Sequence, residues 1–363
     1  MFLSQAGLKT GMEKINTTDL YDGNDSYYDI NHDDMDNDYF AKLRKSLNIM
    51  SVIVYCLAFV LGVLGNGVVI WVTGFKMKKT KTVNTVWFLN LAVADFLFTA
   101  FLPLRVTYTA MDFHWPFGHL MCKLHTTITF LNMFASVYIL VMISVDRCVS
   151  VVWPVWAQNH RNIRKASYVS LGVWVLALIL SAPYFVFKDT FTYSDNTTLC
   201  FTNFALSDDH ETGMFRYQAV AITYILLGFV VPFTVIVSCY AVIIHRLRRN
   251  RTLASKSSRP IYVIAAIITT FFLCWAPYHI MRLIELDNHT RSKTFGHVLS
   301  IGLPITTSLI FFNSCLNPLL YVFMGQDFKD IVHKSILKIF ETTHTNLTVT
   351  SRSKDKSVSD VQV

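Results

Sequence analysis

One carboxylate lies in the middle of a long apolar stretch. Asp95 is the only acidic residue near the centre of any apolar run in the chain. A carboxylate at such a place is expensive, so a functional or ion-linked role is its default interpretation. Side-chain oxygens that could share its surroundings come from two other apolar runs: Asn132, Ser136, Asn313, Ser314 and Asn317. Oxygen ligands suit a small hard cation, so the pattern predicts an allosteric sodium site, with a water-filled polar network as the alternative.

Positive side chains gather at the outer ends of the apolar runs. They are Arg105, Lys188, Arg216 and Arg282, and one acid, Glu285, accompanies them. Arg105 and Arg282 lie well inside their runs, where an unpaired guanidinium is costly unless a pocket or a ligand receives it. We therefore expect them to bind an anionic ligand terminus, such as a peptide carboxylate. For Lys188 and Arg216 the alternative is that they extend to lipid headgroups.

Several large apolar side chains are placed near the same ends of the runs. They could frame an apolar or aromatic end of a peptide, although helix packing explains many such residues equally well. The candidates are Tyr108, Phe113, Phe130, Tyr224, Tyr278, Leu303 and Phe311.

Seven apolar runs must position all these side chains. The 363 residues are 53% hydrophobic and only 15% charged, with a mean hydropathy of +0.40, unlike an average soluble domain. The runs cover residues 47–75, 83–110, 119–145, 166–187, 216–244, 261–286 and 296–324, and each is long enough to cross a bilayer as a helix. The sequence therefore predicts an all-α membrane protein, with a seven-transmembrane helix bundle over 47–325 after a tail over 1–46.

The distribution of Lys and Arg sets the orientation of the bundle. Basic residues collect after the first run, before the fourth, and between the fifth and the sixth. By the positive-inside rule these loops are cytoplasmic, so the N-terminus is outside and the chain belongs in the plasma membrane. Residues 1–20 do not resemble a cleaved signal peptide, so the first span would direct its own insertion. The net charge of +8 fits membrane lipids as partners better than nucleic acid.

The sequence offers no support for enzymatic function or for a bound cofactor other than the ion. It contains no phosphate-binding glycine loop, no nucleophile elbow and no metal-binding spacing among its seven cysteines. Only Cys122 and Cys200 fall in extracellular regions, where disulfides persist, and we expect these two to pair. Four sequons fall on the same side and predict glycosylation at Asn16, Asn24, Asn196 and Asn288.

The two ends of the chain differ in chemistry. Residues 19–38 are rich in Asp and Tyr without Lys or Arg, so we expect disorder up to about residue 40 and steering of a basic protein ligand. Tyrosine sulfation and simple solvation explain this tail equally well. Apolar residues at helical spacing predict an amphipathic helix 8 over 326–341. The Ser/Thr-rich cytoplasmic tail over 342–363 offers phosphorylation sites.

Short motifs follow one another along the seven runs. They are Gly65-Asn66, Leu91–Asp95, Trp115 before Cys122, Asp146-Arg147-Cys148, Trp174, Pro232 with Tyr240, Cys274–Pro277 and Asn317–Tyr321. Over about residues 47–340 their joint order resembles that of rhodopsin-like (class A) G-protein-coupled receptors. Four further stretches are similar to the chemoattractant branch, and within it to the chemerin receptors: 75–80, 87–98, 154–161 and 321–329.

This resemblance implies a receptor for an extracellular peptide or protein agonist. The agonist would shift a two-state bundle toward a form that binds a heterotrimeric G protein, usually of the inhibitory class, with arrestin and receptor kinases as further partners. Asp146 would restrain Arg147 at rest. The other residues expected to rearrange are Pro232, Tyr240, Phe271, Trp275, Pro277 and Tyr321. Thr129 stands where amine-binding relatives have an aspartate, which argues against a biogenic amine.

Departures from the family pattern leave alternatives open. Cys148 replaces a common tyrosine and Val137 a common isoleucine, so basal activity is open. The ligand could be another anionic chemoattractant: a formyl peptide, an anaphylatoxin or a lipid mediator. A non-signalling scavenging receptor is a second alternative, against which the intact Arg147 argues. A channel or transporter is a third, but the sequence shows neither an inverted repeat nor an acidic pore ring.

Overall fold

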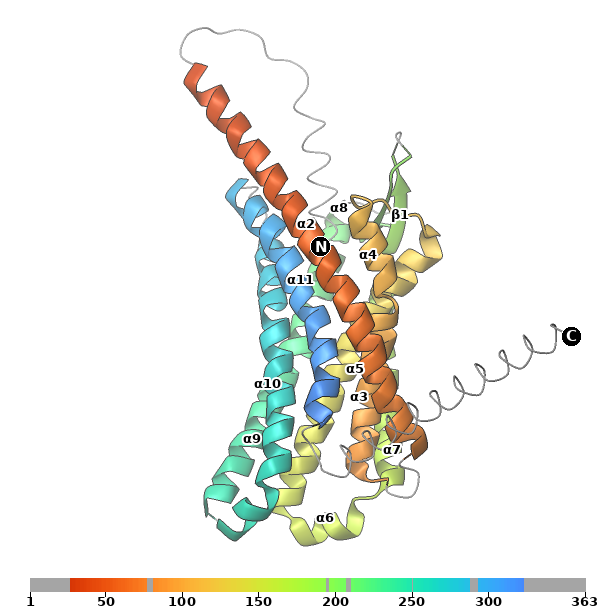
Figure 1. Cartoon of the computed structure of the whole chain (residues 1–363), viewed down its shortest axis with the longest axis vertical. Helices are drawn as coiled ribbons and strands as arrows, with labels where there is room; N and C mark the ends of the chain where they lie inside the picture. Colours follow the sequence, from red (N-terminus) through yellow and green to blue (C-terminus); the bar gives the residue numbers. More distant parts are fainter. Residues whose placement is uncertain are drawn as a thin grey trace, which may run out of the picture.

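A computed structural model describes residues 27–76, 81–193, 196–206, 210–249, 251–287 and 293–322. Within these residues the chain is almost entirely helical (Figure 1). The elements in order are α2 Tyr27–Trp71, the π-helical turn η1 Val72–Lys76, α3 Val83–Ala100, α4 Leu102–Ala110, α5 Gly118–Val152, α6 Pro154–His160, α7 Ile163–Val186, β1 Lys188–Thr192, β2 Thr198–Thr202, α8 His210–Ile225, the π-helical turn η2 Leu226–Val230, α9 Val231–Arg249, α10 Arg251–Asp287 and α11 Lys293–Val322.

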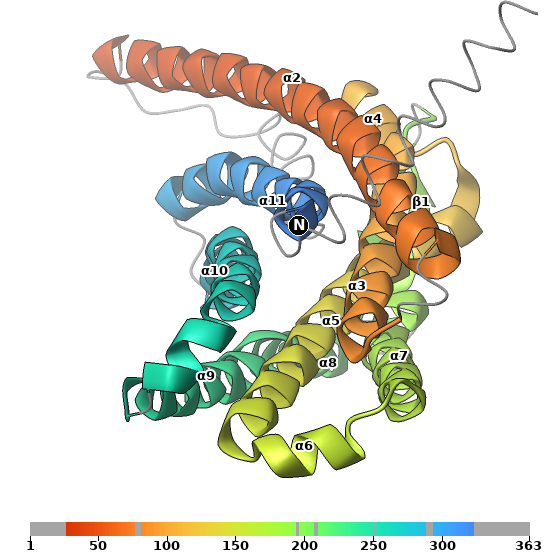
Figure 2. The same ribbon diagram turned by 60° about the horizontal axis from the view of Figure 1, so that its bottom comes forward.

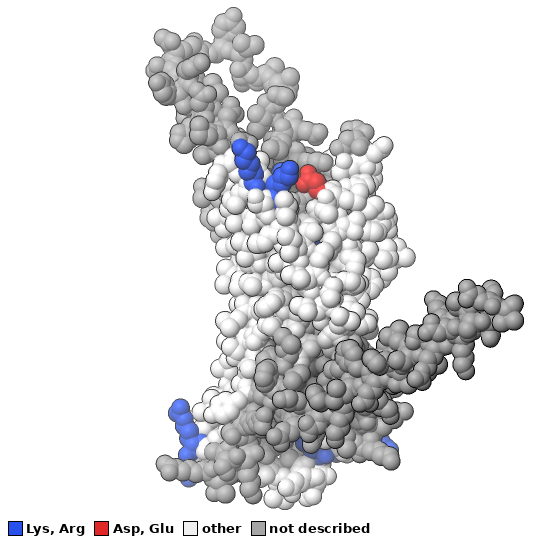
Figure 3. Space-filling view, viewed as in Figure 1, with Lys and Arg blue, Asp and Glu red and all other residues white. Residues whose placement is uncertain are grey.

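Seven stretches of the described helices are long and apolar enough to cross a membrane. They are Tyr39–Phe75, Val83–Ala110, Gly118–Val152, Ile163–Val186, Glu211–Arg249, Ile264–Glu285 and Val298–Pro318. Figure 3 shows the matching surface, on which a broad uncharged belt separates the Lys and Arg side chains near the two ends of the bundle. The predicted fold class, an all-α membrane bundle, is confirmed.

Three helices are longer than the sequence analysis predicted. Helix α2 begins at Tyr27, so the disorder expected up to about residue 40 is wrong for residues 27–40. Likewise α9 ends at Arg249 and α10 starts at Arg251, because the basic connection is rich in helix-forming Arg, Leu and Ala. The predicted helix over 326–341 and the tail over 342–363 lie outside the described residues.

Helix α5 is the central element of the bundle. It contacts α3, α6, α7, α9 and α10, and Figure 2 shows it crossing the bundle obliquely between α3, α7 and α9. Apolar residues on its several faces, among them Met133, Phe134 and Ile139, are completely buried. Residues three or four positions apart along α5 share a face, whereas residues one or two positions apart face different neighbouring helices.

Backbone irregularities shape the end of the bundle that holds the disulfide. The second span breaks at Phe101, where Pro103 starts the separate helix α4. In the fifth span the turn η2 comes just before Pro232, whose missing N–H disturbs the regular helical ladder. A hairpin of β1 and β2, which the sequence analysis did not predict, pairs antiparallel with Thr190 opposite Cys200.

Candidate functional site

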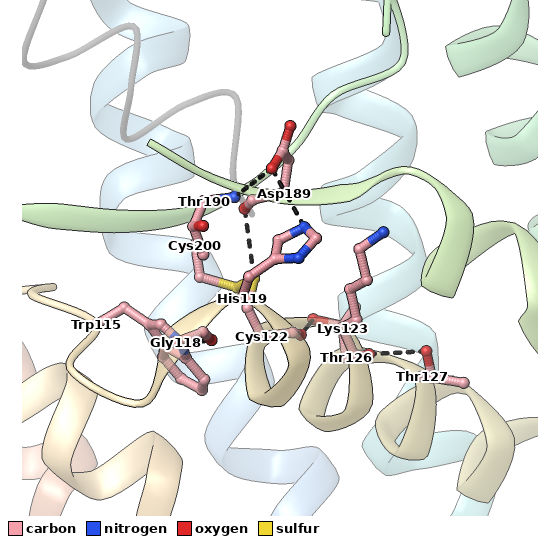
Figure 4. The surroundings of a disulfide bond; sticks show 10 residues. All are labelled: Trp115, Gly118, His119, Cys122, Lys123, Thr126, Thr127, Asp189, Thr190 and Cys200. Carbon is pink, nitrogen blue, oxygen red and sulfur yellow. Dashed lines mark hydrogen bonds and ion pairs between the residues drawn. A yellow bond between two sulfur atoms is a disulfide. The ribbon is translucent and has the colours of Figure 1, made fainter. Parts of the chain in front are cut away.

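A disulfide ties the hairpin to the first turn of α5. Cys122 and Cys200 are bonded with their Cα atoms 5.7 Å apart, and both are buried, which confirms the predicted pair. Figure 4 shows the surroundings of the bond, where the His119 ring of α5 lies 3.3 Å from a carboxylate oxygen of Asp189 on β1. The disulfide and the His119–Asp189 contact therefore hold the hairpin over the end of the bundle at which α5 begins.

A cavity lies among the helices beside this hairpin, with a volume of about 900 Å³ including the open space at its mouth. Its walls combine aromatic side chains with a few charges. The lining residues are Phe98, Arg105, His125, Thr126, Thr129, Phe130, Tyr184, Lys188, Thr202, Phe204, Tyr217, Tyr224, Trp275, Tyr278, Arg282, Glu285, Thr307, Ile310 and Phe311. An enclosed site with mainly apolar walls and few convergent polar groups is typical of a ligand pocket.

Most of the predicted ligand-contact residues line this cavity. The sequence analysis had named nine of them: Arg105, Thr129, Phe130, Lys188, Tyr224, Tyr278, Arg282, Glu285 and Phe311. The stacked rings of Phe130 and Tyr184, with centroids 3.3 Å apart, form one wall. The structure therefore brings these residues together, and whether they bind a ligand stays a prediction.

Two aromatic residues among the four remaining candidates lie away from the cavity. Tyr108 and Phe113 pack edge to face with each other and with Trp115, at centroid distances of 5.4 and 5.5 Å from Tyr108. This small aromatic cluster supports the disulfide instead of a ligand.

The other two candidates that do not line the cavity are Arg216 and Leu303. Arg216 donates hydrogen bonds to the carbonyls of Phe204 and Ala205 at 3.3 and 3.4 Å, so it holds the loop after β2 instead of lining the cavity. Leu303 belongs to the buried helix-packing cluster. Both positions were chosen from span ends alone, which does not reveal the direction in which a side chain points.

The cavity carries an excess of positive charge. Arg105 and Lys188 are only 4% and 2% exposed, so the interpretation that Lys188 extends to lipid headgroups is wrong. Arg282 forms an ion pair with Glu285 on the same helix, which neutralises one of the three cations. Burial, with Arg282 and Arg105 nearby, lowers the pKa of the Lys188 amine well below its usual range.

Sequence reasoning missed several residues of the cavity wall. Those from the hairpin and the loop after it, such as Thr202 and Phe204, carry no motif and depend on the strand pairing. Tyr184 could have been predicted from the sequence, because it directly follows Pro183, a proline inside the fourth span near the outer end of α7. His125, Thr126, Tyr217, Thr307 and Ile310 occupy helix faces that periodicity alone leaves ambiguous.

Below the cavity, the residues of the predicted ion site are all buried. Asn317 of α11 donates a 2.7 Å hydrogen bond to Asp95 of α3, and Ser136 donates one of 3.3 Å to Asn132 within α5. Four further oxygens in this set have no hydrogen-bond partner: Asp95 Oδ1, Asn313 Oδ1, Ser314 Oγ and Asn317 Oδ1. Buried acceptors without donors fit a small hard cation. These oxygen atoms are therefore suitable ligands for sodium.

At the opposite end of α5 the Asp146 carboxylate is shared by two arginines. Arg147 donates to Asp146 at 2.7 Å and to Asn84 at 2.6 Å. Arg161, which ends α6, donates to both carboxylate oxygens at 2.7 and 2.9 Å and to Asn84 at 2.7 Å. The sequence analysis anticipated only the first pair, having counted Arg161 merely as a cytoplasmic charge. The Tyr240 hydroxyl forms no hydrogen bond with the described residues. The Tyr321 side chain lies outside the part of the chain that the structure describes.

An aromatic stack connects the floor of the cavity with the bundle core. Trp275 lines the cavity and stacks on Phe271, with centroids 5.8 Å apart. Pro232 is buried on α9, and Pro277 follows Trp275 by two residues on α10. Of the predicted switch residues, Trp275 and Phe271 therefore contact each other at the wall of the cavity where a ligand would sit.

Comparison with known proteins identifies the family. The family described as "7 transmembrane receptor (rhodopsin family)" matches residues 65–321. The chain is a member of the rhodopsin family of seven-transmembrane receptors. Receptors of this family are not enzymes.

The receptor is also similar to individual members of the family. Chemerin-like receptor 1 of Sus scrofa is 48% identical over 327 residues, covering 86% of this chain and 88% of the relative. Chemerin-like receptor 2 of Homo sapiens is 39% identical over 334 residues, 92% of each chain. The C3a anaphylatoxin chemotactic receptor of Oncorhynchus mykiss is 42% identical over 326 residues, 89% of this chain and 86% of the relative. The recognised branch, a chemerin-receptor type, is confirmed.

One predicted glycosylation site lies on the described surface of the receptor. Asn196 is exposed between β1 and β2, with a positive φ of 61°. It therefore occurs at the same end of the bundle as the disulfide. Asn16, Asn24 and Asn288 lie outside the described residues.

Proposed function

We propose that the receptor is a cell-surface receptor for a chemerin-like chemoattractant peptide or protein, and that it signals through inhibitory G proteins and arrestin. The names of its relatives support the ligand class. The observation that carries the proposal is the buried pair of cations, Arg105 and Lys188, in an otherwise aromatic cavity. In this arrangement the apolar end of a peptide contacts the rings and its terminal carboxylate meets the cations.

The orientation follows from the same chemistry. Disulfides persist in oxidising compartments, so the end with Cys122 and Cys200 faces outside and the N-terminus is extracellular. The end with Asp146 and Arg147 then faces the cytoplasm, where receptor kinases and G proteins act. On activation Arg147 leaves Asp146, and the freed guanidinium becomes available to the transducer.

The carboxylate proposal is tested by measuring G-protein activation with a chemerin-like C-terminal peptide as the free acid and as the amide. In the unmodified receptor the free acid is the stronger agonist. Arg105→Gln should weaken the free acid by about 10- to 100-fold and the amide much less, because a hydrogen bond to a charged group contributes ~1.5–3 kcal/mol. Equal losses for both peptides would show that Arg105 does not recognise the carboxylate. An anaphylatoxin-like peptide as the stronger agonist would favour the first alternative ligand class.

Signalling itself is tested by the same assay without reference to the ligand's terminus. Ligand uptake without nucleotide exchange on any inhibitory G protein would identify a scavenging receptor. Ion flux through reconstituted vesicles would instead favour a channel.

We further propose that Asp95 and its oxygen neighbours bind sodium in the resting receptor. The bound ion supplies a positive charge that compensates the buried carboxylate, and the residues that would hold it are Asp95, Asn132, Ser136, Asn313, Ser314 and Asn317. Replacing potassium by sodium should lower agonist affinity, and Asp95→Asn should abolish that difference. If the unmodified receptor responds identically to both cations, the polar network holds water only.

A further inference from the structure

A second groove lies between α2 and α4 and shares no lining residue with the ligand cavity. It has a volume of about 1110 Å³ including its open mouth. One wall is the part of α2 between Ala41 and Ile53, and the other is the end of α4 from Thr109 to Asp112. Since α4 precedes the disulfide-linked turn of α5, the groove opens near the same end of the bundle as the hairpin (Figure 1).

The charges at the rim of the groove have both signs. Arg44 and Lys45 come from α2, and Asp112 comes from the chain just after α4. All three side chains are exposed. None of the three forms an ion pair with another residue in the part of the chain that the structure describes. The rim therefore presents two positive charges and one negative charge on opposite walls.

The apolar part of the groove continues into the membrane-facing surface of α2. Ile49 and Ile53 line the groove and are each 55% exposed. Leu57 and Leu61 follow on the same face at four-residue spacing and are exposed too. An acyl chain can follow this row from the rim into the uncharged belt. A soluble anion could use the charges but not the apolar row.

One hydroxyl in the groove lacks a partner. Thr109 is only 5% exposed, and its Oγ1 has no hydrogen bond. Its neighbour Thr107 shows the ordinary arrangement, donating to the carbonyl of Pro103 at 3.0 Å. A buried hydroxyl without a partner is costly, and Thr109 is one of the residues that line the groove. A small movement of the groove wall would let this hydroxyl donate to an ester or phosphate oxygen of a bound lipid.

We propose that the groove between α2 and α4 binds a phospholipid whose headgroup carries both a phosphate and a cationic amine. Arg44 and Lys45 bind the phosphate, Asp112 faces the amine, and Ile49 and Ile53 contact an acyl chain. Charge complementarity selects this class, because an anionic lipid without the amine leaves Asp112 without a cationic partner. The site is separate from the agonist cavity, so it holds a structural or regulatory lipid.

Native mass spectrometry of the full-length receptor in detergent tests the proposal. Dioleoyl phosphatidylcholine and dioleoyl phosphatidylglycerol, which share their acyl chains, are titrated separately. The unmodified receptor should retain phosphatidylcholine at the lower concentration. The double variant Arg44→Gln/Lys45→Gln should lose about fivefold in affinity per cation removed, as expected for basic residues at a lipid surface. Lys42→Gln, which removes one positive charge on α2 outside the groove, should retain the lipid.

A second variant separates the headgroup chemistry from general lipid adhesion. Asp112→Asn should remove the preference for phosphatidylcholine over phosphatidylglycerol while leaving total lipid binding intact. Soluble phosphocholine should not compete at concentrations where the lipid saturates. Equal retention of the two lipids by the unmodified receptor, unchanged retention by the double variant, or efficient competition by phosphocholine would each overturn the proposal. Agonist binding of every variant checks that it is folded.

Discussion

Removal of Arg161 should make the receptor harder to activate. In the described state the Asp146 carboxylate accepts two hydrogen bonds from Arg161 and one from Arg147. If activation withdraws Arg147, Asp146 still keeps a cationic partner as long as Arg161 is present. Without Arg161, the same step leaves a largely buried carboxylate, 12% exposed, with no cation.

The size of the effect follows from that burial. Leaving a buried hydrogen-bonding group unsatisfied costs about 1–3 kcal/mol, and more for a charged one. A difference of ~1–3 kcal/mol between two states changes their ratio by about 5- to 150-fold. Arg161→Gln should therefore lower agonist-independent nucleotide exchange, and should right-shift the agonist response, by a factor within this range.

The assay is nucleotide exchange on a purified inhibitory G protein, normalised to receptor number. Arg164→Gln is the matched control, because Arg164 is an exposed base in the same segment and makes no contact with Asp146. Asp146→Asn should raise basal exchange. In the Asp146→Asn receptor, adding Arg161→Gln should have little further effect, because no carboxylate remains that could lose its cationic partner. Higher basal exchange in Arg161→Gln alone would refute the reasoning and identify Arg161 as part of the restraint.

Three further predictions concern the disulfide, the buried lysine and one helix contact. Cys200→Ser should reduce folded surface receptor, because losing a disulfide typically costs ~2–4 kcal/mol, whereas Cys56→Ser, at an exposed free thiol, should not; antibody labelling of intact cells measures both. Burial lowers the pKa of Lys188, so its positive charge is lost on raising the pH sooner than that of an ordinary lysine; free-acid affinity should therefore fall as pH rises, a slope that Lys188→Met removes in competition binding. Gly62→Ala should lower the melting temperature because a Cβ there clashes with α3, whereas Gly172→Ala, in open space, should not.

The sequence predicts the spans well because their signal is both long and strong. Each crossing needs about 20 apolar residues, so hydropathy alone locates it. The disulfide was predictable because only Cys122 and Cys200 fall outside on the inferred topology. Helix ends were less predictable, as the start of α2 at Tyr27 shows, because polar helical residues leave no hydropathy signal.

Within the site, the sequence predicts which charged residues need a partner, but not the direction in which each side chain points. Arg105 and Arg282 were found because a guanidinium inside a span demands a partner. The sequence did not reveal that Arg216 contacts a loop and not the cavity, because a residue at the end of a span can do either. The partnership of Arg161 with Asp146 spans 15 residues and depends on the fold of α6, which no local pattern encodes.

The geometry of α5 explains how one helix can couple the two ends of the receptor. Phe130 lines the cavity, Asn132 and Ser136 belong to the ion site, and Arg147 belongs to the cytoplasmic network. At about 1.5 Å per residue, Phe130 and Arg147 are roughly 25 Å apart, too far for direct electrostatic contact through the bundle. Coupling must therefore pass through packed elements with alternative arrangements. The stack of Trp275 on Phe271, which starts in the cavity floor, is the element whose displacement a ligand can cause directly.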